Sequence, residues 1–200
     1  MSPKQQRGEA TVERLLSTAL RVYADCGRQG FTVNAVTAAG GVSLGSLYHH
    51  FGSFDGLAAA LHARCAEELR GEVVAALSRT RTARTGVRAV VTAYLRFTEE
   101  HPEAALFLHA SAYSGRLLAD APADRTRAAR TPLLAAIEAW MRPFVEAGEI
   151  APTPEPLIEA LLVGPVAAIA HRRLSGAHDA DLAGTARILS DRIWRALRPE

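Results

Sequence analysis

Small hydrogen-bonding side chains are concentrated between residues 43 and 50 of this 200-residue chain. A hydroxyl, a phenol and an imidazole stand at Ser46, Tyr48 and His50. Short donors of this kind can reach phosphate oxygens, which are frequent hydrogen-bond partners of proteins on DNA. Gly45 leaves room for a helix to approach base edges closely. The residue types therefore favour nucleic-acid binding as the chemistry of this segment.

Two short helices joined by a tight turn would position these side chains. Thr32 and Ser43 can each cap a helix, because a hydroxyl oxygen accepts the free backbone N–H groups of a first turn. Gly41 can take the positive φ that the reversal between the helices requires. Leu47 and Phe51 are four residues apart and share the inner face of the second helix. This layout is typical of a helix-turn-helix, whose second helix enters the DNA major groove.

The second of these helices carries a sequence resemblance. Residues 42–57, Val-Ser-Leu-Gly-Ser-Leu-Tyr-His-His-Phe-Gly-Ser-Phe-Asp-Gly-Leu, look like the signature of the TetR family of bacterial transcriptional repressors. The similarity covers roughly residues 10–57 and continues beyond them only as length and helical layout. It implies a homodimer that holds two reading helices in successive major grooves of a pseudopalindromic operator. It also implies regulation by a small-molecule effector, without indicating which one.

The resemblance implies roles for individual side chains in and near the second helix. The expected phosphate contacts come from Thr32, Ser46, Tyr48 and His50, the base contacts from Asn34, Leu44, Gly45 and His49, and a further DNA contact from Ser43. In chemical terms Asn34 could pair with an adenine edge, whereas Leu44 could touch only a thymine methyl. The alternative is that Tyr48 packs against the first helix and that the histidines are merely solvated.

One position departs from the family pattern. In Ser53-Phe54-Asp55 the middle residue is usually Lys, whose amine binds a phosphate, and this chain has Phe54. One phosphate contact per subunit is therefore expected to be missing. Lys4, Arg7 and Arg14 could partly compensate by reaching the DNA backbone or the minor groove. Alternatively, Phe54 is a packed anchor between the reading helices and the long helix that follows.

Apolar spacing predicts an all-α fold of about nine helices, because no segment alternates convincingly in the manner of a strand. An N-terminal helix-turn-helix bundle, residues 1–52, is expected to precede a helical ligand-binding and dimerisation domain, residues 53–200. The first helix should span Glu9–Cys26 and end at Gly27 and Gly30. Later helices are expected at about 53–79, 86–100, 103–113, 125–147, 155–175 and 181–197, with loops at 80–85 and 114–124.

Aromatic side chains recur along the middle helices. The corresponding helices of the family usually enclose a cavity, and apolar cavities with a few polar groups are ligand sites. We expect a small apolar or aromatic effector without strong charge, because few acids or bases lie among these residues. The predicted lining is Tyr94, Phe97, Phe107, Tyr113, Ile137, Trp140, Met141 and Phe144. The alternative is that these side chains are simply core.

The last two helices are predicted to form the dimer interface. The first of them is apolar nearly all round, which indicates burial on more than one side. The final helix carries an apolar stripe, and two such helices per subunit would pair as an intermolecular four-helix bundle. The predicted interface is Leu157, Leu161, Val166, Ile169, Leu182, Ala186, Leu189, Ile193 and Ala196. Alternatively, both helices complete the core of one subunit.

Other chemistries lack a pattern in the sequence. No phosphate loop, nucleophile elbow or His-Glu-x-x-His motif is present, so neither enzyme activity nor a cofactor is expected. His62 and Cys65 have a spacing that can chelate a metal, but no third ligand is evident nearby. Packing is therefore the preferred interpretation there, and no metal is expected. Cys26 and Cys65 are expected to be reduced, buried thiols.

The N-terminus, the longest apolar run and the net charge bear on the cellular location and the class of the protein. The short polar N-terminus lacks an apolar signal core, and the apolar run Leu157–Ala170 is too short to span a bilayer. We therefore expect a cytoplasmic protein without membrane contact. The net charge of +2 is too small to indicate DNA binding by itself. Together with Phe54, it keeps one rival function open, a helical small-molecule-binding or catalytic protein that has lost operator binding.

Overall fold

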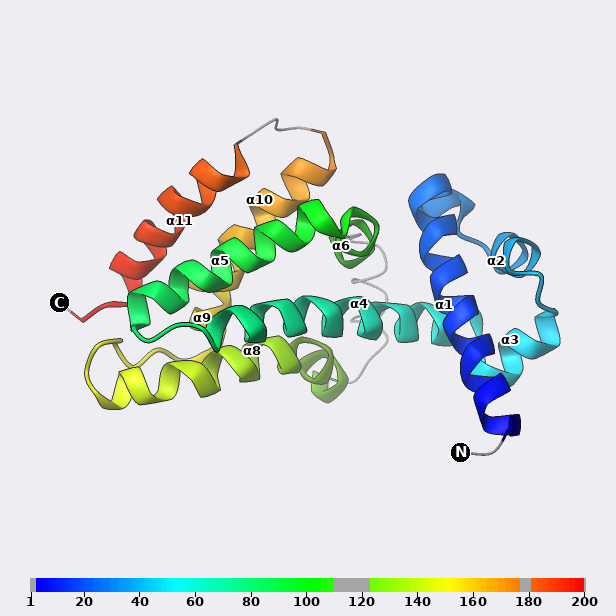
Figure 1. The fold of residues 1–200 in the computed structure, drawn as a ribbon, viewed down its shortest axis with the longest axis horizontal. Coiled ribbons are helices and arrows are strands. Elements are labelled where there is room, and N and C mark those ends of the chain that lie inside the picture. The colour runs from blue at the N-terminus through cyan, green and yellow to red at the C-terminus, as the bar shows by residue number, and fades with distance from the viewer. Residues whose placement is uncertain (1–2, 110–122, 177–180, 200) are drawn as a thin grey trace.

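The computed structural model describes residues 3–109, 123–176 and 181–199, and within them the secondary structure is helical with no strand. Figure 1 shows a small bundle of helices at one end, which contains the N-terminus. A long helix, α4, leads from this bundle into a larger group of helices, and the C-terminus lies at the far end of that group. The predicted fold class is confirmed.

Helix α1 (Pro3–Gly30) begins earlier and ends later than predicted. Its apolar stripe is buried as the spacing requires, with Leu15 and Ala19 fully enclosed. The backbone leaves helical geometry at Gly27, whose φ is 61° and ψ is −167°, so the predicted stop marks a break after which the chain turns once more. Cys26 is exposed beside this break, and the prediction that both thiols are buried was wrong for it.

Helices α2 (Val33–Gly40) and α3 (Leu44–Phe51) follow, and α4 (Phe54–Leu77) starts after a short turn. Ser53 caps α4, since the backbone N–H of Gly56 donates to its Oγ at 2.9 Å. An apolar seam recurs every four residues along α4, and all of its members are buried: Leu57, Leu61, Cys65, Leu69, Val73 and Leu77. Because α4 packs against α1 and α3 as well as α5, α6 and α8, it joins the small bundle to the larger group.

Helix α5 (Ala83–Glu100) starts inside the segment that was predicted to be a loop. Thr82 and Thr85 form a reciprocal cap, in which each hydroxyl accepts a backbone N–H from the other residue at 3.2–3.3 Å. The polar residues of 80–85 are thus partly the cap and first turn of a helix. Helix α6 (Pro102–His109) follows after His101. The predicted loop 114–124 falls almost entirely outside the described residues.

The later helices are α8 (Ala123–Glu146), α9 (Glu155–Ile158), α10 (Gly164–Leu174) and α11 (Leu182–Leu197). A π-helix, η1 (Glu159–Val163), joins α9 to α10, so the predicted single helix of 155–175 contains a widened turn. The π-helix ends two residues before Pro165. A proline has no backbone N–H to donate, and its ring crowds the helical turn before it.

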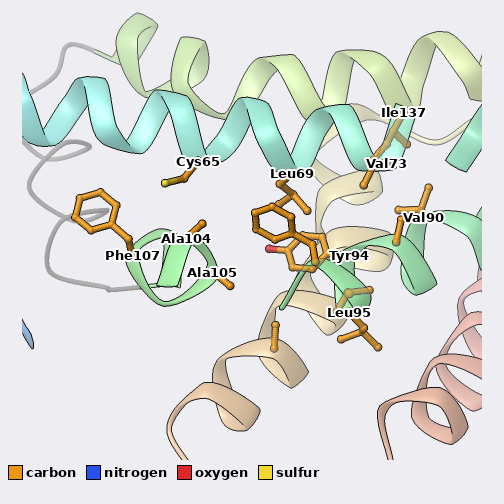
Figure 2. Close-up of a cluster of buried hydrophobic side chains, with 14 of the residues drawn as sticks. Cys65, Leu69, Val73, Val90, Tyr94, Leu95, Ala104, Ala105, Phe107 and Ile137 are labelled. Carbon is orange, nitrogen blue, oxygen red and sulfur yellow. The ribbon is translucent and has the colours of Figure 1, made fainter. Parts of the chain in front are cut away.

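The larger group of helices shares one apolar core. Figure 2 shows part of it, where side chains from α4, α5, α6 and α8 meet. Phe107 of α6 and Ile137 of α8 lie toward opposite ends of this view, with Tyr94 of α5 between them. Helix α11 covers α5 from the other side, and its residues Ile193 and Leu197 are buried.

Candidate nucleic-acid interface

Local hydrogen bonds build the turn between α2 and α3 as the sequence predicts. The backbone N–H of Ala35 donates to Thr32 Oγ1 and that of Ser46 donates to Ser43 Oγ, each at 3.2 Å. Gly41 takes a left-handed φ of 57° and closes the C-terminus of α2. These contacts fix where α3 begins and how it is rotated against α2.

The inner side of this helix pair is packed and the outer side is open. Val36 of α2 and Leu47 of α3 are completely buried. On the outer side of α3, Leu44 is 45% exposed and Tyr48 is 44% exposed. The residues predicted to contact DNA are half-buried at Ser46 and His50 and exposed elsewhere, at Thr32, Asn34, Ser43, Leu44, Gly45, Tyr48 and His49.

The end of α3 is crowded by rings. The imidazoles of His49 and His50 are 5.1 Å apart between centroids, and His50 lies 6.5 Å from the ring of Phe51. A Cβ built on Gly8 of α1 would lie 3.9 Å from His50 Cε1. The backbone of α1 at Gly8 therefore runs beside the end of α3 near His50.

Phe54 lies against the small bundle. Its ring centroid is 4.9 Å from that of Phe31, and its side chain is half-buried. Phe31 is itself buried and touches the rings of Tyr23 and Phe107. These contacts support the interpretation of Phe54 as a packed anchor between the reading helices and α4.

The predicted effector residues do not form one compact lining. Buried members are Tyr94, Phe97, Phe107, Ile137 and Met141, half-buried members are Trp140 and Phe144, and Tyr113 lies outside the described residues. The ring of Phe107 is 4.8 Å from that of Tyr23 in α1, so this residue faces the small bundle. The indole of Trp140 instead fills the space over Gly86, at the start of α5. The two aromatics thus pack at different places.

A polar contact interrupts the core between α5, α6 and α10. Tyr94 Oη and His109 Nε2 are 3.5 Å apart, and the ring of His171 is 6.4 Å from that of His109. Burial raises the pKa of the Tyr94 phenol to about 12. Burial, and then the nearby His171, lower the pKa of His109 to about 4. Both groups are therefore neutral near pH 7, which suits an uncharged hydrogen-bonding partner.

The predicted interface stripe divides between the inside and the outside of the protomer. The structure buries Val166, Leu182, Ala186 and Ile193 in the protomer's own core. This packing within the protomer, of α11 on α5 and of α10 on α5 and α6, argues against the prediction that these four contact a second copy. The other predicted members are half-buried at Leu161, Ile169 and Leu189, and exposed at Leu157 and Ala196.

The sequence did not indicate three residues that have clear roles in the structure, one exposed apolar residue and two packing residues. Ile188 is 60% exposed on α11, on the side away from its buried stripe. An apolar residue outside the stripe was the signal that could have found it. Gly86 is needed to admit the Trp140 indole, and Phe31 connects Phe54 to Phe107. No local pattern indicates either role, because both partners are distant in sequence.

The cysteine and histidine pair on α4 is explained by packing. Cys65 is fully enclosed, and burial together with the charge of Glu68 raises the pKa of its thiol to about 12. Burial also lowers the pKa of His62. Among the residues that the structure describes, no group of three or more His, Cys, Asp or Glu side chains is placed to hold a metal ion.

The sequence profile of bacterial regulatory proteins of the tetR family matches residues 15–61. This range contains α2, α3 and the start of α4, together with most of α1. This N-terminal part of the chain belongs to the TetR family. The fold of the described residues is that of TetR-family transcription regulators. No curated protein sequence matches this chain at a significant level.

Solved structures share the fold over nearly the whole chain. A TetR family transcription regulator from Marinobacter aquaeolei VT8 superimposes with a TM-score of 0.74 at 22% identity, covering 98% of this chain and 100% of that one. A putative tetR family regulator from Shewanella sp. PV-4 gives 0.76 at 21% identity, covering 95% and 99%. The regulator FadR from Bacillus subtilis, solved in complex with stearoyl-CoA, gives 0.75 at 13% identity, covering 90% and 96%.

These similarities concern the architecture, since the identities are low. They extend the similarity beyond the profile match, because the superposition includes the helices after residue 61. No helix in the described ranges of the chain is both long enough and apolar enough to cross a membrane.

Proposed function

We propose that this protein is a homodimeric repressor that binds a pseudopalindromic operator in double-stranded DNA and leaves it when a small molecule binds. The observation that carries the proposal is the open face of α3, where Tyr48 and His49 are exposed on a helix whose start is capped by Ser43. A rigid helix with outward polar groups can enter a major groove without the entropic cost of first becoming ordered.

We assign the two functions to different parts of the chain. Residues 1–52 would read DNA, and residues 53–200 would bind the effector and the second copy. In the dimer, the exposed apolar residues Leu157 on α9 and Ile188 on α11 would contact the partner. The two reading helices would then lie about 34 Å apart, the distance of one DNA turn.

The effector we propose is mainly apolar and carries one uncharged polar group. Tyr94 and the half-buried His109 supply the hydrogen-bonding pair for that group, and Phe97 and Leu69 are among the buried apolar side chains of the same core. FadR from Bacillus subtilis, solved in complex with stearoyl-CoA, has a similar fold, and the apolar acyl chain of that ligand supports a mainly apolar effector here. To release DNA, the effector must bind one arrangement of the two reading helices more tightly than the other.

Selection of genomic DNA fragments with the purified protein tests the DNA-binding part. We expect enrichment of one pseudopalindromic sequence, and footprints that cover two half-sites. Tyr48→Ala should lose most of the binding, while Tyr23→Phe, a change to a ring outside α3, should keep it. Absence of any enriched sequence would favour the rival function, in which the fold binds only small molecules.

Sedimentation of two variants tests the dimer. Ile188→Asp should give folded monomers, because it places a charge in the proposed interface. Ile193→Asp is the control for a core position and should lose stability instead, because that side chain is buried within the protomer. A dimer that persists in both Ile188→Asp and Leu157→Asp would contradict the proposed interface.

A further inference from the structure

The small bundle is attached to α4 by an ionic contact far from the reading helix. Arg64 Nη1 of α4 donates to Glu13 Oε1 of α1 at 2.8 Å and to Ser17 Oγ at 3.2 Å. The hydroxyl of Ser17 in turn donates to Glu13 Oε1 at 3.1 Å. On the other side of the guanidinium, Nε donates to Glu68 Oε1 at 3.2 Å, so α4 holds the arginine in place.

A second attachment is aromatic. Phe31 contacts Phe54 at the start of α4, and Tyr23 and Phe31 both contact Phe107 of α6. Apolar burial resists separation of the bundle from α4 and is itself non-directional. Edge-to-face ring pairs such as Tyr23–Phe107 add a preference for certain ring orientations, so the aromatic contact contributes to the angle of the bundle on α4 but does not set it alone.

The ionic contact adds directional hydrogen bonds to this attachment. A guanidinium is planar, and its donors point in fixed directions. Arg64 Nε donates to Glu68 of the same helix, and Arg64 Nη1 donates to Glu13 and Ser17 of α1. Because Glu13 and Ser17 are one helical turn apart and also bond to each other, the contact resists rotation of α1 about the guanidinium.

We propose that Arg64 is a positioning residue for DNA binding, which fixes the angle of the reading helices on α4 and thereby the half-site spacing that the dimer accepts. This inference rests on the proposed function, because spacing has meaning only for a dimer on an operator. Arg64 itself lies on α4, about three turns after its start, and none of its bonds involves a residue predicted to contact DNA.

A spacing experiment separates positioning from ordinary stabilisation. Operator variants with spacers shortened or lengthened by one or two base pairs are titrated with the full-length wild type, with Arg64→Met and with Arg70→Met. Arg70 is the matched control, since it pairs with Glu67 within α4. Arg64→Met should weaken binding to the best spacing by about 2- to 30-fold and flatten the preference among spacings. Arg70→Met should behave as wild type.

Two further readouts separate positioning from loss of fold. Affinity for DNA that carries a single half-site should be unchanged in Arg64→Met, because the reading helix itself is intact. The melting temperature should stay within about 4 °C of wild type, as expected for loss of a partly exposed ion pair. Loss of half-site affinity equal to the loss on full operators would overturn the proposal.

A distance measurement tests the same inference without DNA. Spin labels are attached at Arg21→Cys on α1 and Thr92→Cys on α5 in a Cys26→Ser background; both sites are exposed, and Cys65 is buried. The distance distribution should broaden in Arg64→Met and stay narrow in Arg70→Met. Equal widths would overturn the positioning role. If wild type binds no DNA but the widths differ as expected, the proposed function fails while the attachment is established.

Discussion

The reading bundle of α1–α3 and the core of α4–α11 carry their candidate functional groups in opposite ways. In the bundle, Tyr48 and His49 stand in solvent on a helix whose start is fixed by a local cap between Ser43 and Ser46. In the core, Tyr94 is buried and His109 is half-buried, and their contact joins α5 to α6. The bundle presents its polar groups to solvent, whereas the core packs them between helices.

This difference predicts how each region responds to substitution. Exposed groups with local supports can be exchanged at little cost in stability, so their loss should change binding alone. Enclosed groups contribute to the free energy of unfolding, so their loss should change stability first. Substitutions in the core and at its junction with the bundle sharpen this contrast, and the largest effect is expected at a glycine.

Gly86→Val should be the most damaging change in the core. A Cβ at this position would lie 1.7 Å from Trp140 Cζ2, so the indole must move. We expect a loss of about 3 kcal/mol in the free energy of unfolding, measured by denaturant titration. Gly71→Ala in α4 is the control, since a Cβ added there would meet no atom within 4 Å, and it should stabilise by about 0.5–1 kcal/mol. Equal stability of the two variants would contradict the packing of Trp140.

Phe54→Lys tests whether this junction residue belongs to the core or to the DNA contact. Because the ring packs on Phe31, we expect a loss of about 2 kcal/mol in stability and no gain in DNA affinity. The slope of log K against log salt should stay at the wild-type value. If the ammonium instead reached a phosphate in each subunit, two added contacts would steepen that slope by roughly 1.8. Phe54→Leu, which keeps an apolar side chain, should lose much less stability.

His109 should make the stability of the core depend on pH. Its pKa is about 4 in the folded chain, and the ordinary value is near 6.5 in the unfolded chain. The unfolded state therefore binds more protons between these values, and stability should fall as the pH drops from 6.5 to 4. We expect about 1–2 kcal/mol from this group in urea titrations, and a shallower dependence in His109→Gln. His62, whose pKa is also lowered, should supply a remaining slope. An unchanged pH dependence in His109→Gln would show that the imidazole is accessible to protons.

The smallest expected effect in this comparison of exposed and buried groups concerns the two cysteines. Cys26 is exposed at the end of α1, and Cys65 is enclosed in α4 with a pKa of about 12. A thiol reagent at mildly alkaline pH should modify Cys26 in the folded protein, and should modify Cys65 only after denaturant is added. Rapid modification of Cys65 in the folded state would mean that the core opens readily, and would support an accessible effector site.

The bundle could be predicted from sequence because its determinants are local. Thr32, Ser43 and Gly41 each act on neighbours within a few residues, and the structure shows the expected caps and the left-handed glycine. The predicted start of α5 was wrong for a related reason: Thr82 and Thr85 are polar, and a reciprocal cap has the composition of a loop. Propensity alone cannot separate the two.

The packing of the core was harder to predict from sequence, because an apolar stripe does not indicate which surface it packs against. Leu182, Ala186 and Ile193 have the spacing of an interface helix and are buried against the protomer's own α5. In the same way, the aromatics predicted to line one site divide between the α1 junction, at Phe107, and the start of α5, at Trp140. Which partner a buried side chain meets is set by contacts between residues far apart in sequence.

DNA recognition is assigned to the outer face of α2 and α3, and two substitutions there give the most direct test. Asn34→Ala should relax the base preference at one position of each half-site, by roughly 1–3 kcal/mol if the contact is bidentate. His50→Ala should weaken binding to all sequences about equally, because a phosphate contact carries no base information. Both variants should keep the wild-type melting temperature. If both variants kept the wild-type affinity and base preference, DNA recognition could not lie on this face.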